Sequence, residues 1–274
     1  MNIAILGAGY LGKEVALNWS KKNHHVTATT RQAERLLDLA HAAQKCIILR
    51  EVTEESLAPL LFENETLLIT IGAKSPDNYE SAYLHTAQTL RRLAVKSKLS
   101  RRLIYTSSTS VYGDHQGLWV DEASELKAQS DKVKVLIETE QLYSSLKEIG
   151  WHVCIFRLAE LYGPGRELSQ RLRSHKGSPL PGNGANFSNM IHRSDAVLAI
   201  DYALKHHLTG IYNLADDDHP TRQQLYQAIA AKLSLPPVRW DPAYDIFHGG
   251  NKRVSNHKIK SEGFAFLHPH RVIE

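Results

Sequence analysis

The sequence has few cysteines, no apolar run of membrane-spanning length and no dominant sign of charge. Only Cys46 and Cys154 are present, and each lies in a strand-like apolar run, which predicts buried, reduced thiols rather than a disulfide framework. The 33 basic and 29 acidic side chains give a net charge of +4. They form no basic stripe interleaved with aromatic residues, so we expect no nucleic-acid partner. We expect no membrane partner either, because no apolar stretch is long enough to span a bilayer.

A targeting sequence and a metal site are also not indicated. A strand-like run begins at Asn2 and leaves no room for a signal peptide, so with the reduced cysteines we expect a cytoplasmic protein. The 15 histidines show no recognised ligand spacing, and we predict no metal. The length of 274 residues allows one large α/β domain, or a sheet domain with a smaller lobe.

The first 18 residues carry the strongest functional signal. Residues 2–6 form a short apolar run typical of a buried strand, and a helical pattern begins near residue 12. Between them stands Gly7-Ala-Gly9-Tyr10-Leu11-Gly12, the G-x-G-x-x-G pattern in the strand–helix context that a dinucleotide-binding turn requires. Gly7 permits the tight turn, Gly9 lets backbone amides approach a pyrophosphate, and Gly12 lets helix and strand pack closely. We therefore predict a dinucleotide site at this helix N-terminus.

The second strand, residues 25–30, predicts which dinucleotide is bound. In NAD-binding folds an acidic residue near the end of this strand accepts hydrogen bonds from the ribose 2′-hydroxyl. This chain has Thr30 and Arg31 there, and the nearest acid is Glu34. A hydroxyl and a guanidinium would bind a 2′-phosphate, which an acid would repel. The pattern favours NADP, with NAD as the alternative. For Arg31 itself, the alternative interpretation is a surface charge at the start of a helix over residues 32–43.

Further strand-like runs alternate with helical segments along the chain. Runs at 45–49, 66–72 and 102–106, with a helix over 79–97, predict an α/β fold: a doubly wound parallel sheet (Rossmann fold) with a small C-terminal substrate lobe. Ligands of such sheets bind beyond the carboxyl ends of the strands, so we predict cofactor contacts at Gly72, Ala73 and Thr106. We assign residues 1–160 to the dinucleotide-binding core, and 161–274 to a smaller substrate lobe plus segments that return to the core.

Several motifs then appear in one order along the chain: Thr106-Ser-Ser-Thr-Ser-Val-Tyr-Gly113, Arg157-Leu-Ala-Glu-Leu-Tyr-Gly-Pro-Gly165, Asn189-Met-Ile-His-Arg-Ser-Asp195 and Gly210-Ile-Tyr-Asn-Leu-Ala215. On these motifs the chain resembles the extended short-chain dehydrogenase/reductase family, which includes nucleotide-sugar epimerases and dehydratases. The compact length and the ending with Asn256, Lys258, Gly263 and Phe264 are most similar to its atypical YeeZ-like subgroup.

The resemblance implies catalysis by a Tyr and a Lys four residues apart, on the helix after the fifth strand, with a Ser at the position of Ser108. The Lys cation lowers the Tyr pKa, so that the phenol exchanges a proton with the substrate while hydride moves. Glu140 resembles the Glu that follows the family's Lys by four residues. Counting back places Lys132 where the Tyr belongs and Leu136 where the Lys belongs, so the pair is absent on this alignment.

The sequence offers two other placements of the pair. Tyr143-Ser-Ser-Leu-Lys147 has the right spacing, but Tyr143 comes about ten residues into the helix, roughly 15 Å below the site, so we interpret it as a packing residue. A two-residue slip would offer Ser130 and Lys134, but a Ser hydroxyl cannot replace a phenol in acid–base catalysis.

Four residues are candidates for contacting substrate. Tyr112 follows Ser108 in the motif, although the family usually uses this Tyr structurally. Arg166, after Gly-Pro-Gly, is suited to a phosphate or carboxylate, with a surface arginine as the alternative. Asn189 and His192 belong to a motif on the substrate side in relatives, where we expect Asp195 to cap the following helix.

We expect structural roles for two further polar stretches, residues 216–218 and 248–256. The acidic residues 216–218 are expected to favour the start of a helix over 221–233. The basic stretch 248–256 is expected at the surface.

Two functions stay open from the sequence. The first is an NADP-preferring oxidoreductase or epimerase-like enzyme that acts on a small alcohol, carbonyl or sugar-derived substrate. The second is a catalytically degenerate protein that binds NADP as a structural or sensing ligand, suggested by the missing Tyr-Lys pair. By analogy with relatives, a homodimer is compatible with either function.

Overall fold

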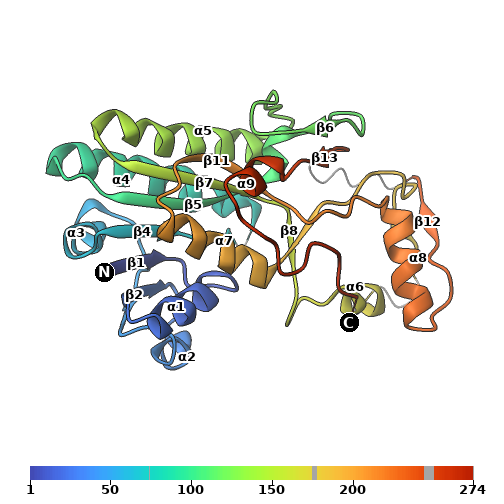
Figure 1. Ribbon diagram of the computed structural model, residues 1–274, viewed down its shortest axis with the longest axis horizontal. Coiled ribbons are helices and arrows are strands. Elements are labelled where there is room, and N and C mark those ends of the chain that lie inside the picture. The colour runs from blue at the N-terminus through green and yellow to red at the C-terminus, as the bar shows by residue number, and fades with distance from the viewer. Residues whose placement is uncertain (74, 175–177, 244–249, 274) are drawn as a thin grey trace. The chain divides into compact units, whose positions relative to one another are not determined.

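The computed structural model describes residues 1–73, 75–174, 178–243 and 250–273 (Figure 1). The helices are α1 (Gly12–Lys21), α2 (Leu36–Ala40), α3 (Glu54–Glu63), α4 (His85–Ser97), α5 (Asp131–Ser145), α6 (Leu168–Ser174), α7 (Arg193–Lys205), α8 (Arg222–Lys232) and α9 (His257–Ser261). The longer strands are β1 (Asn2–Leu6), β2 (His25–Thr30), β3 (Lys45–Ile48), β4 (Thr66–Ile69), β5 (Arg102–Ser108), β7 (His152–Leu158) and β11 (Gly210–Leu214). The short strands are β6 (Trp119–Val120), β8 (Glu160–Tyr162), β9 (Leu180–Pro181), β10 (Met190–His192), β12 (Trp240–Asp241) and β13 (Arg253–Val254).

The seven longer strands form one sheet in the order β11-β7-β5-β4-β1-β2-β3. Neighbouring strands from β3 to β5 run parallel, and β1 lies between β2 and β4. This is the strand order of doubly wound dinucleotide-binding folds. From β1 the chain first adds β2 and β3 on one side and then returns to add β4 and β5 on the other, so the switch point of the strand order lies between β1 and β4. The predicted doubly wound parallel sheet is confirmed.

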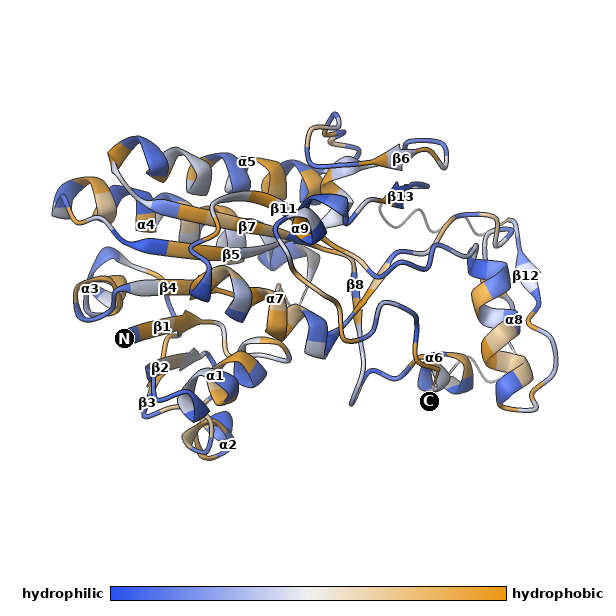
Figure 2. Cartoon of the chain, viewed as in Figure 1, coloured by the Kyte–Doolittle hydropathy of each residue, from blue (hydrophilic) through white to orange (hydrophobic). Residues whose placement is uncertain are grey.

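The sheet forms because its central strands are rich in apolar residues, which Figure 2 shows in orange along β1 and much of β7. Residues Ile3–Leu6 of β1 and Leu67–Ile69 of β4 are buried. On one face α3, α4 and α5 pack side by side, and their apolar side chains share a core with the strands. On the other face α1 and α7 are joined by a hydrogen bond from the Trp19 indole to Asp201.

Several predicted elements differ in detail from those observed. The helix expected over 32–43 is a 3-10 turn (Ala33–Arg35) followed by the short α2. The helix expected over 79–97 begins as a π-helical turn, η3 (Glu80–Leu84), and only then continues as α4. Cys46, expected to be buried, is half-buried, whereas Cys154 is buried, and neither cysteine forms a disulfide.

The chain divides into two compact units. Unit 1 holds residues 1–107, 130–156 and 197–211, and unit 2 holds 108–129, 157–196 and 212–274. The boundary at residue 160 stays a prediction. Within the described residues, no helix is both long enough and apolar enough to cross a membrane.

Unit 2 corrects two expectations about polar residues. Asp195 does not cap its helix, because α7 begins at Arg193 and Asp195 lies in the first turn. In the basic stretch 248–256, residues 248 and 249 lie outside the described residues. Lys252 is 4% exposed and directly precedes β13, which pairs with β6. The Lys252 ammonium donates to the Gly113 carbonyl, 3.1 Å away. The stretch expected at the surface therefore contains a buried residue.

Candidate functional site

The glycine-rich turn lies between β1 and α1, where β1 meets β4. Gly7 has a φ of +89°, and a Cβ there would lie 2.9 Å from the Ile71 backbone. A Cβ at Gly12 would lie 2.5 Å from the Thr70 hydroxyl oxygen and 2.6 Å from the Gly7 carbonyl oxygen. Thr70 donates a hydrogen bond to that same carbonyl at 2.8 Å. Gly7 and Gly12 are therefore required by the turn's own packing.

Gly9 differs from these two glycines. The nearest atom to a Cβ built there is the Gly7 carbonyl oxygen at 3.9 Å, an ordinary contact distance, and its φ is not positive. The fold itself therefore leaves room for a side chain at Gly9. This open space beside the first amides of α1, which lack partners within the helix, fits a dinucleotide pyrophosphate. Tyr10 and Leu11 follow Gly9 and lead into the helix, with Leu11 at its N-cap position.

The predicted ribose and adenosine contacts surround the ends of β2 and β4. Thr30 is 6% exposed, and its hydroxyl accepts a hydrogen bond from the Gln32 amide at 3.2 Å. Arg31 is exposed, and its guanidinium donates to the Gly72 carbonyl at 3.2 Å. The geometry thus brings Arg31 to the loop after β4, whereas the Thr30 hydroxyl is occupied by its own turn.

The loop after β4 is open on the side of Gly72, where an added Cβ would meet nothing within 4 Å. The amide of Ala73 donates to the Tyr83 hydroxyl at 3.3 Å, and burial raises the pKa of that phenol. Thr106, 9% exposed, donates its hydroxyl to the Ile69 carbonyl at 3.2 Å, which ties β5 to β4.

Ser108 and Tyr112 lie in the motif that follows β5. Ser108 is half-buried, and its hydroxyl accepts a hydrogen bond from the Ser110 amide at 3.1 Å. Tyr112 is 0% exposed. Its hydroxyl donates to Asn213 at 2.7 Å and accepts from Arg157 at 3.0 Å, and burial raises its pKa to about 12. These contacts favour the structural alternative for Tyr112.

On α5 no Tyr-Lys pair takes the family's place. Ser130 caps the helix by accepting from the Val133 amide, Lys132 is exposed, and Leu136 is buried. Tyr143 is 1% exposed, and its ring lies 4.8 Å from the Tyr105 ring between centroids. Burial raises the pKa of Tyr143 well above that of an exposed phenol. Tyr143 is therefore a core residue, as its place in the helix indicates.

The other predicted substrate residues lie in unit 2. Arg166 is exposed at a tight turn, with its amide donating to the Gly163 carbonyl at 2.7 Å. The Asn189 side chain is engaged at both ends: its amide group donates to the Lys252 carbonyl at 2.9 Å, and its oxygen accepts from the Val254 amide at 2.8 Å. These bonds show that Asn189 holds the segment around β13 in place.

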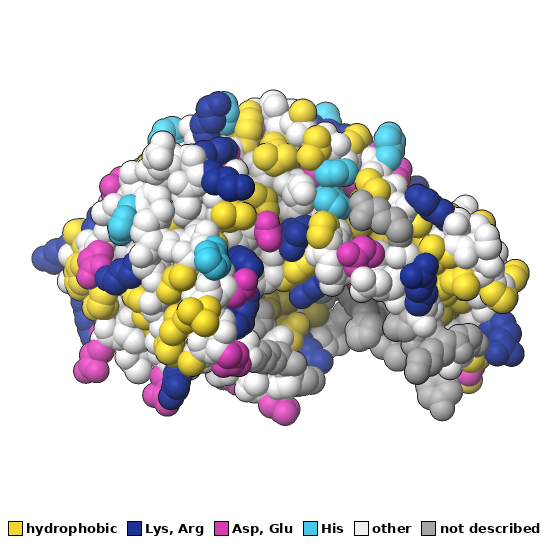
Figure 3. Space-filling model, turned by 90° about the horizontal axis from the view of Figure 1, so that it is seen from below, with side chains coloured by type: hydrophobic (Ala, Val, Ile, Leu, Met, Phe, Trp, Pro, Cys, Tyr) yellow, Lys and Arg dark blue, Asp and Glu magenta, His cyan; other side chains and the backbone are white. Residues whose placement is uncertain are grey.

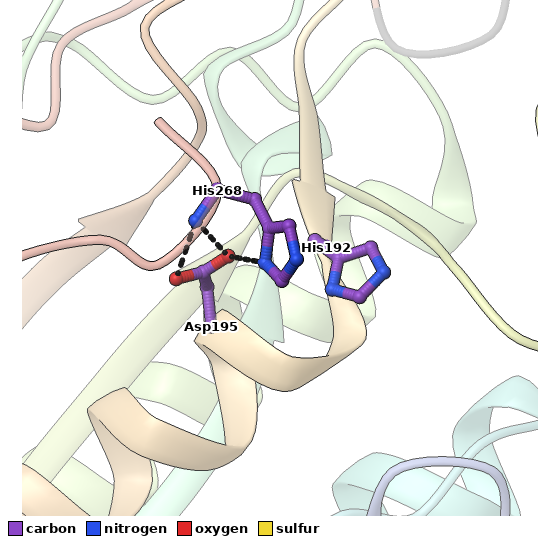
Figure 4. Close-up of side chains that lie close together, drawn as sticks. All are labelled: His192, Asp195 and His268. Atoms are coloured by element: carbon purple, nitrogen blue, oxygen red, sulfur yellow. Dashed lines mark hydrogen bonds and ion pairs between the residues drawn. The ribbon is translucent and has the colours of Figure 1, made fainter. Parts of the chain in front are cut away.

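His192 packs beside a histidine from the C-terminal segment, as Figure 4 shows. The His192 and His268 ring centroids are 4.0 Å apart. Asp195, 0% exposed, accepts from the His268 backbone amide and from the His268 ring nitrogen Nδ1, the latter at 2.9 Å. A ligand atom from each of the three side chains lies within 4.8 Å of the others. The Asp195 carboxylate also accepts a hydrogen bond from the Leu267 amide. These hydrogen bonds hold the C-terminal segment against α7. The absence of a metal stays a prediction.

Comparison with known proteins decides the family. Residues 3–215 match the profile of the NAD dependent epimerase/dehydratase family. The chain belongs to this family. It is 30% identical over 277 aligned positions to Protein YeeZ of Escherichia coli K12, covering 99% of this chain and 97% of that protein.

Two further relatives of this epimerase/dehydratase chain extend the comparison. It is 26% identical to the 3-diazoavenalumate denitrifying reductase of a Streptomyces species, over 89% of this chain and 85% of that protein. The dTDP-glucose 4,6-dehydratase DesIV of Streptomyces venezuelae, solved with NAD bound, superposes with a TM-score of 0.81 at 20% identity, covering 97% of this chain and 92% of DesIV. The likeness to DesIV supports the fold.

The surface of this family member shows no concentration of one charge on the face drawn in Figure 3, where basic and acidic side chains are interspersed. This agrees with the small net charge of +4.

One half-buried histidine of unit 2, His219, makes stability depend on pH. His219 lies 3.0 Å from the Asn189 side-chain oxygen and edge-on to Trp119. Burial, followed by the Arg271 charge, lowers its pKa from 6.5 to about 4. Because the unfolded chain takes up this proton first, the contribution of His219 to stability is lost as pH falls from 6.5 towards about 4.

We predict that His219→Gln loses part of this acid sensitivity. Between about pH 7 and pH 5, wild type should lose about 1 kcal/mol more unfolding free energy than the variant, after allowance for solvent screening. Urea denaturation at both pH values measures this, with His257→Gln at an exposed position as the control. An equal pH dependence in wild type and His219→Gln would contradict the assignment.

Proposed function

We propose that this protein is an NADP-preferring oxidoreductase or epimerase-like enzyme acting on a small alcohol, carbonyl or sugar-derived substrate. The observation that carries the proposal is the space at Gly9, which the packing of the turn does not need and a pyrophosphate would use. The relatives support it: one is named a reductase and another a dTDP-glucose dehydratase solved with NAD. Ser108 is proposed to hold the reacting oxygen, and Arg166 and His192 to contact substrate.

The preference for NADP rests on Arg31. Its guanidinium is exposed and already lies at the end of β4 through its bond to Gly72. No acidic side chain stands at Thr30 to accept from a ribose 2′-hydroxyl. A bidentate guanidinium is well suited to a 2′-phosphate, which NADPH has and NADH lacks.

Arg31→Ala is expected to weaken NADPH binding by about tenfold to a hundredfold, since a charge-assisted hydrogen bond contributes about 1.5 to 3 kcal/mol. NADH binding should change little. Nucleotide fluorescence titrations of both cofactors measure the ratio, with Arg35→Ala, one turn further along the chain, as the control. Equal losses for the two nucleotides would refute the 2′-phosphate contact.

A second function, NADP binding without hydride transfer, is favoured by the helix α5. Lys132 and Leu136 occupy the positions of the family's Tyr and Lys, and Tyr143 is buried. Loss of general acid–base catalysis typically slows a reaction by a factor of about 10² to 10⁴. In this function the nucleotide would serve as a structural or sensing ligand.

Turnover distinguishes the two functions. Purified protein is mixed with NADPH or NADP⁺ and a panel of carbonyl compounds and sugar nucleotides, and both nicotinamide absorbance and the formation of product are followed, because an epimerase consumes no net nucleotide. Product formation that falls in Ser108→Ala supports the enzyme. Tight NADPH binding without turnover, unaffected by Ser108→Ala, supports the second function. A cytoplasmic location and a homodimer stay proposals, which fractionation and light scattering would test.

A further inference from the structure

The structure brings together a tyrosine and a lysine that are 53 positions apart in the chain. The Lys132 ammonium nitrogen lies 5.7 Å from the centroid of the Tyr79 ring, within the range of a cation–π interaction. Lys132 is at the second position of α5, and Tyr79 directly precedes η3. Both residues belong to unit 1. This is the position on α5 at which relatives would carry the catalytic Tyr.

Tyr79 is available for chemistry in a way that other tyrosines of unit 1 are not. Its side chain is half-buried, and among the described residues its hydroxyl has no hydrogen-bond partner. The Tyr83 hydroxyl is occupied by the Ala73 amide. Tyr105 and Tyr143 are 0% and 1% exposed. Tyr79 is therefore a phenol beside a cation and open to a ligand.

The backbone around Tyr79 is unusual for a helix. Residues Glu80–Leu84 form a π-helical turn, against which α5 packs. A single π turn inserts one residue into the helical repeat and rotates the preceding side chains, and such turns are frequent at functional sites. Across this turn the Tyr79 and Tyr83 ring centroids are 5.1 Å apart.

We propose that Tyr79 is the acid–base residue of the reaction and that Lys132 is its positioning cation, in place of a Tyr-x-x-x-Lys pair on one helix. This inference rests on the proposed function. In the reductive direction, a reduced nicotinamide nucleotide, when bound, would supply the hydride that the carbonyl carbon accepts. Tyr79 gives its O–H proton to the carbonyl oxygen as the C=O π bond breaks, and the alcohol forms. The Lys132 ammonium stabilises the phenolate until solvent returns the proton.

The first test compares turnover in matched variants. Tyr79→Phe is expected to lower kcat about a hundredfold or more, with NADPH affinity unchanged. Lys132→Met should lower kcat about tenfold, whereas Lys132→Arg, which keeps the cation, should retain most of the wild-type kcat. Lys134→Met, on the same helix, and Tyr202→Phe, on α7, are the controls and should retain activity. Turnover by Tyr79→Phe at the wild-type rate would overturn the inference while leaving the proposed function intact.

A second test needs no turnover. 3-Fluorotyrosine placed at position 79 reports its surroundings through ¹⁹F NMR. Lys132→Met and saturating NADP⁺ should each shift this resonance, whereas Lys134→Met should not. A resonance unmoved by both changes overturns the inference. Failure of wild type to bind NADPH removes the proposed function and the inference together.

Discussion

Gly9→Ala is expected to lose NADPH binding without losing stability. An added Cβ at Gly9 approaches no atom of the protein closer than 3.9 Å, and its φ is one that alanine can adopt. Removing a glycine at such a position restricts the unfolded chain and stabilises a protein by about 0.4 to 1 kcal/mol. The same methyl would occupy the space predicted for the pyrophosphate.

Overpacking of this kind costs about 1 to 3 kcal/mol, which corresponds to a loss of about tenfold to a hundredfold in affinity. Fluorescence titration with NADPH and thermal unfolding of the free protein measure the two effects separately. Gly12→Ala is the contrasting variant, because its Cβ would lie 2.5 Å from Thr70; it should lose both binding and stability. Unchanged NADPH affinity in Gly9→Ala would place the dinucleotide elsewhere.

The regular part of the fold follows from local sequence. Five of the predicted strands coincide with β1 to β5 to within a few residues, because apolar runs and turn residues act over short distances. The strand order is then constrained by right-handed crossovers and short connections. The interruption of the helix after β4 by η3 was not predicted, since a π turn leaves no pattern in hydrophobic spacing.

The polar contacts within each unit could not be predicted in the same way. The basic stretch 248–256, which contains Lys252, is expected at the surface from its sequence, and only the fold shows that the Lys252 ammonium donates to the Gly113 carbonyl. Tyr79 and Lys132 lie on separate helices, so no motif with fixed spacing contains both. Asp195 was expected to act within its own helix, but its partners come from residues 267 and 268. Such pairs depend on tertiary structure alone.

The acidic residues 216–218 show most clearly that the polar contacts depend on tertiary structure. They were expected to favour a helix start, but the cap of α8 is Thr221, which accepts from the Gln224 amide. Asp216 is instead 0% exposed and binds Arg271, whose side chain is 3% exposed. The guanidinium also donates to the Ser188 hydroxyl and to the carbonyls of Ser188 and Asp218. These bonds hold the C-terminal segment within unit 2.

Arg271→Met is expected to cause the largest loss of stability, about 3 to 5 kcal/mol, because it leaves the buried Asp216 carboxylate without its cation. Burial already raises the pKa of Asp216 to about 7 against the opposing Arg271 charge. A protonated carboxyl needs no cation, so the loss should narrow as the pH falls below about 7. Urea denaturation of wild type and variant at mildly alkaline pH, where the Asp216 carboxyl is ionised, and at mildly acidic pH measures both effects.

Two further variants make the Arg271 prediction specific. Asp216→Asn combined with Arg271→Met should recover part of the loss, since the unpaired charge is then absent. Lys260→Met breaks the pair with Asp217, which is 31% exposed, and should cost less than about 1 kcal/mol because exposed ion pairs contribute little. Equal losses of unfolding free energy in Arg271→Met and Lys260→Met would contradict this prediction, because they would mean that the buried Asp216–Arg271 pair contributes no more to stability than the exposed Asp217–Lys260 pair.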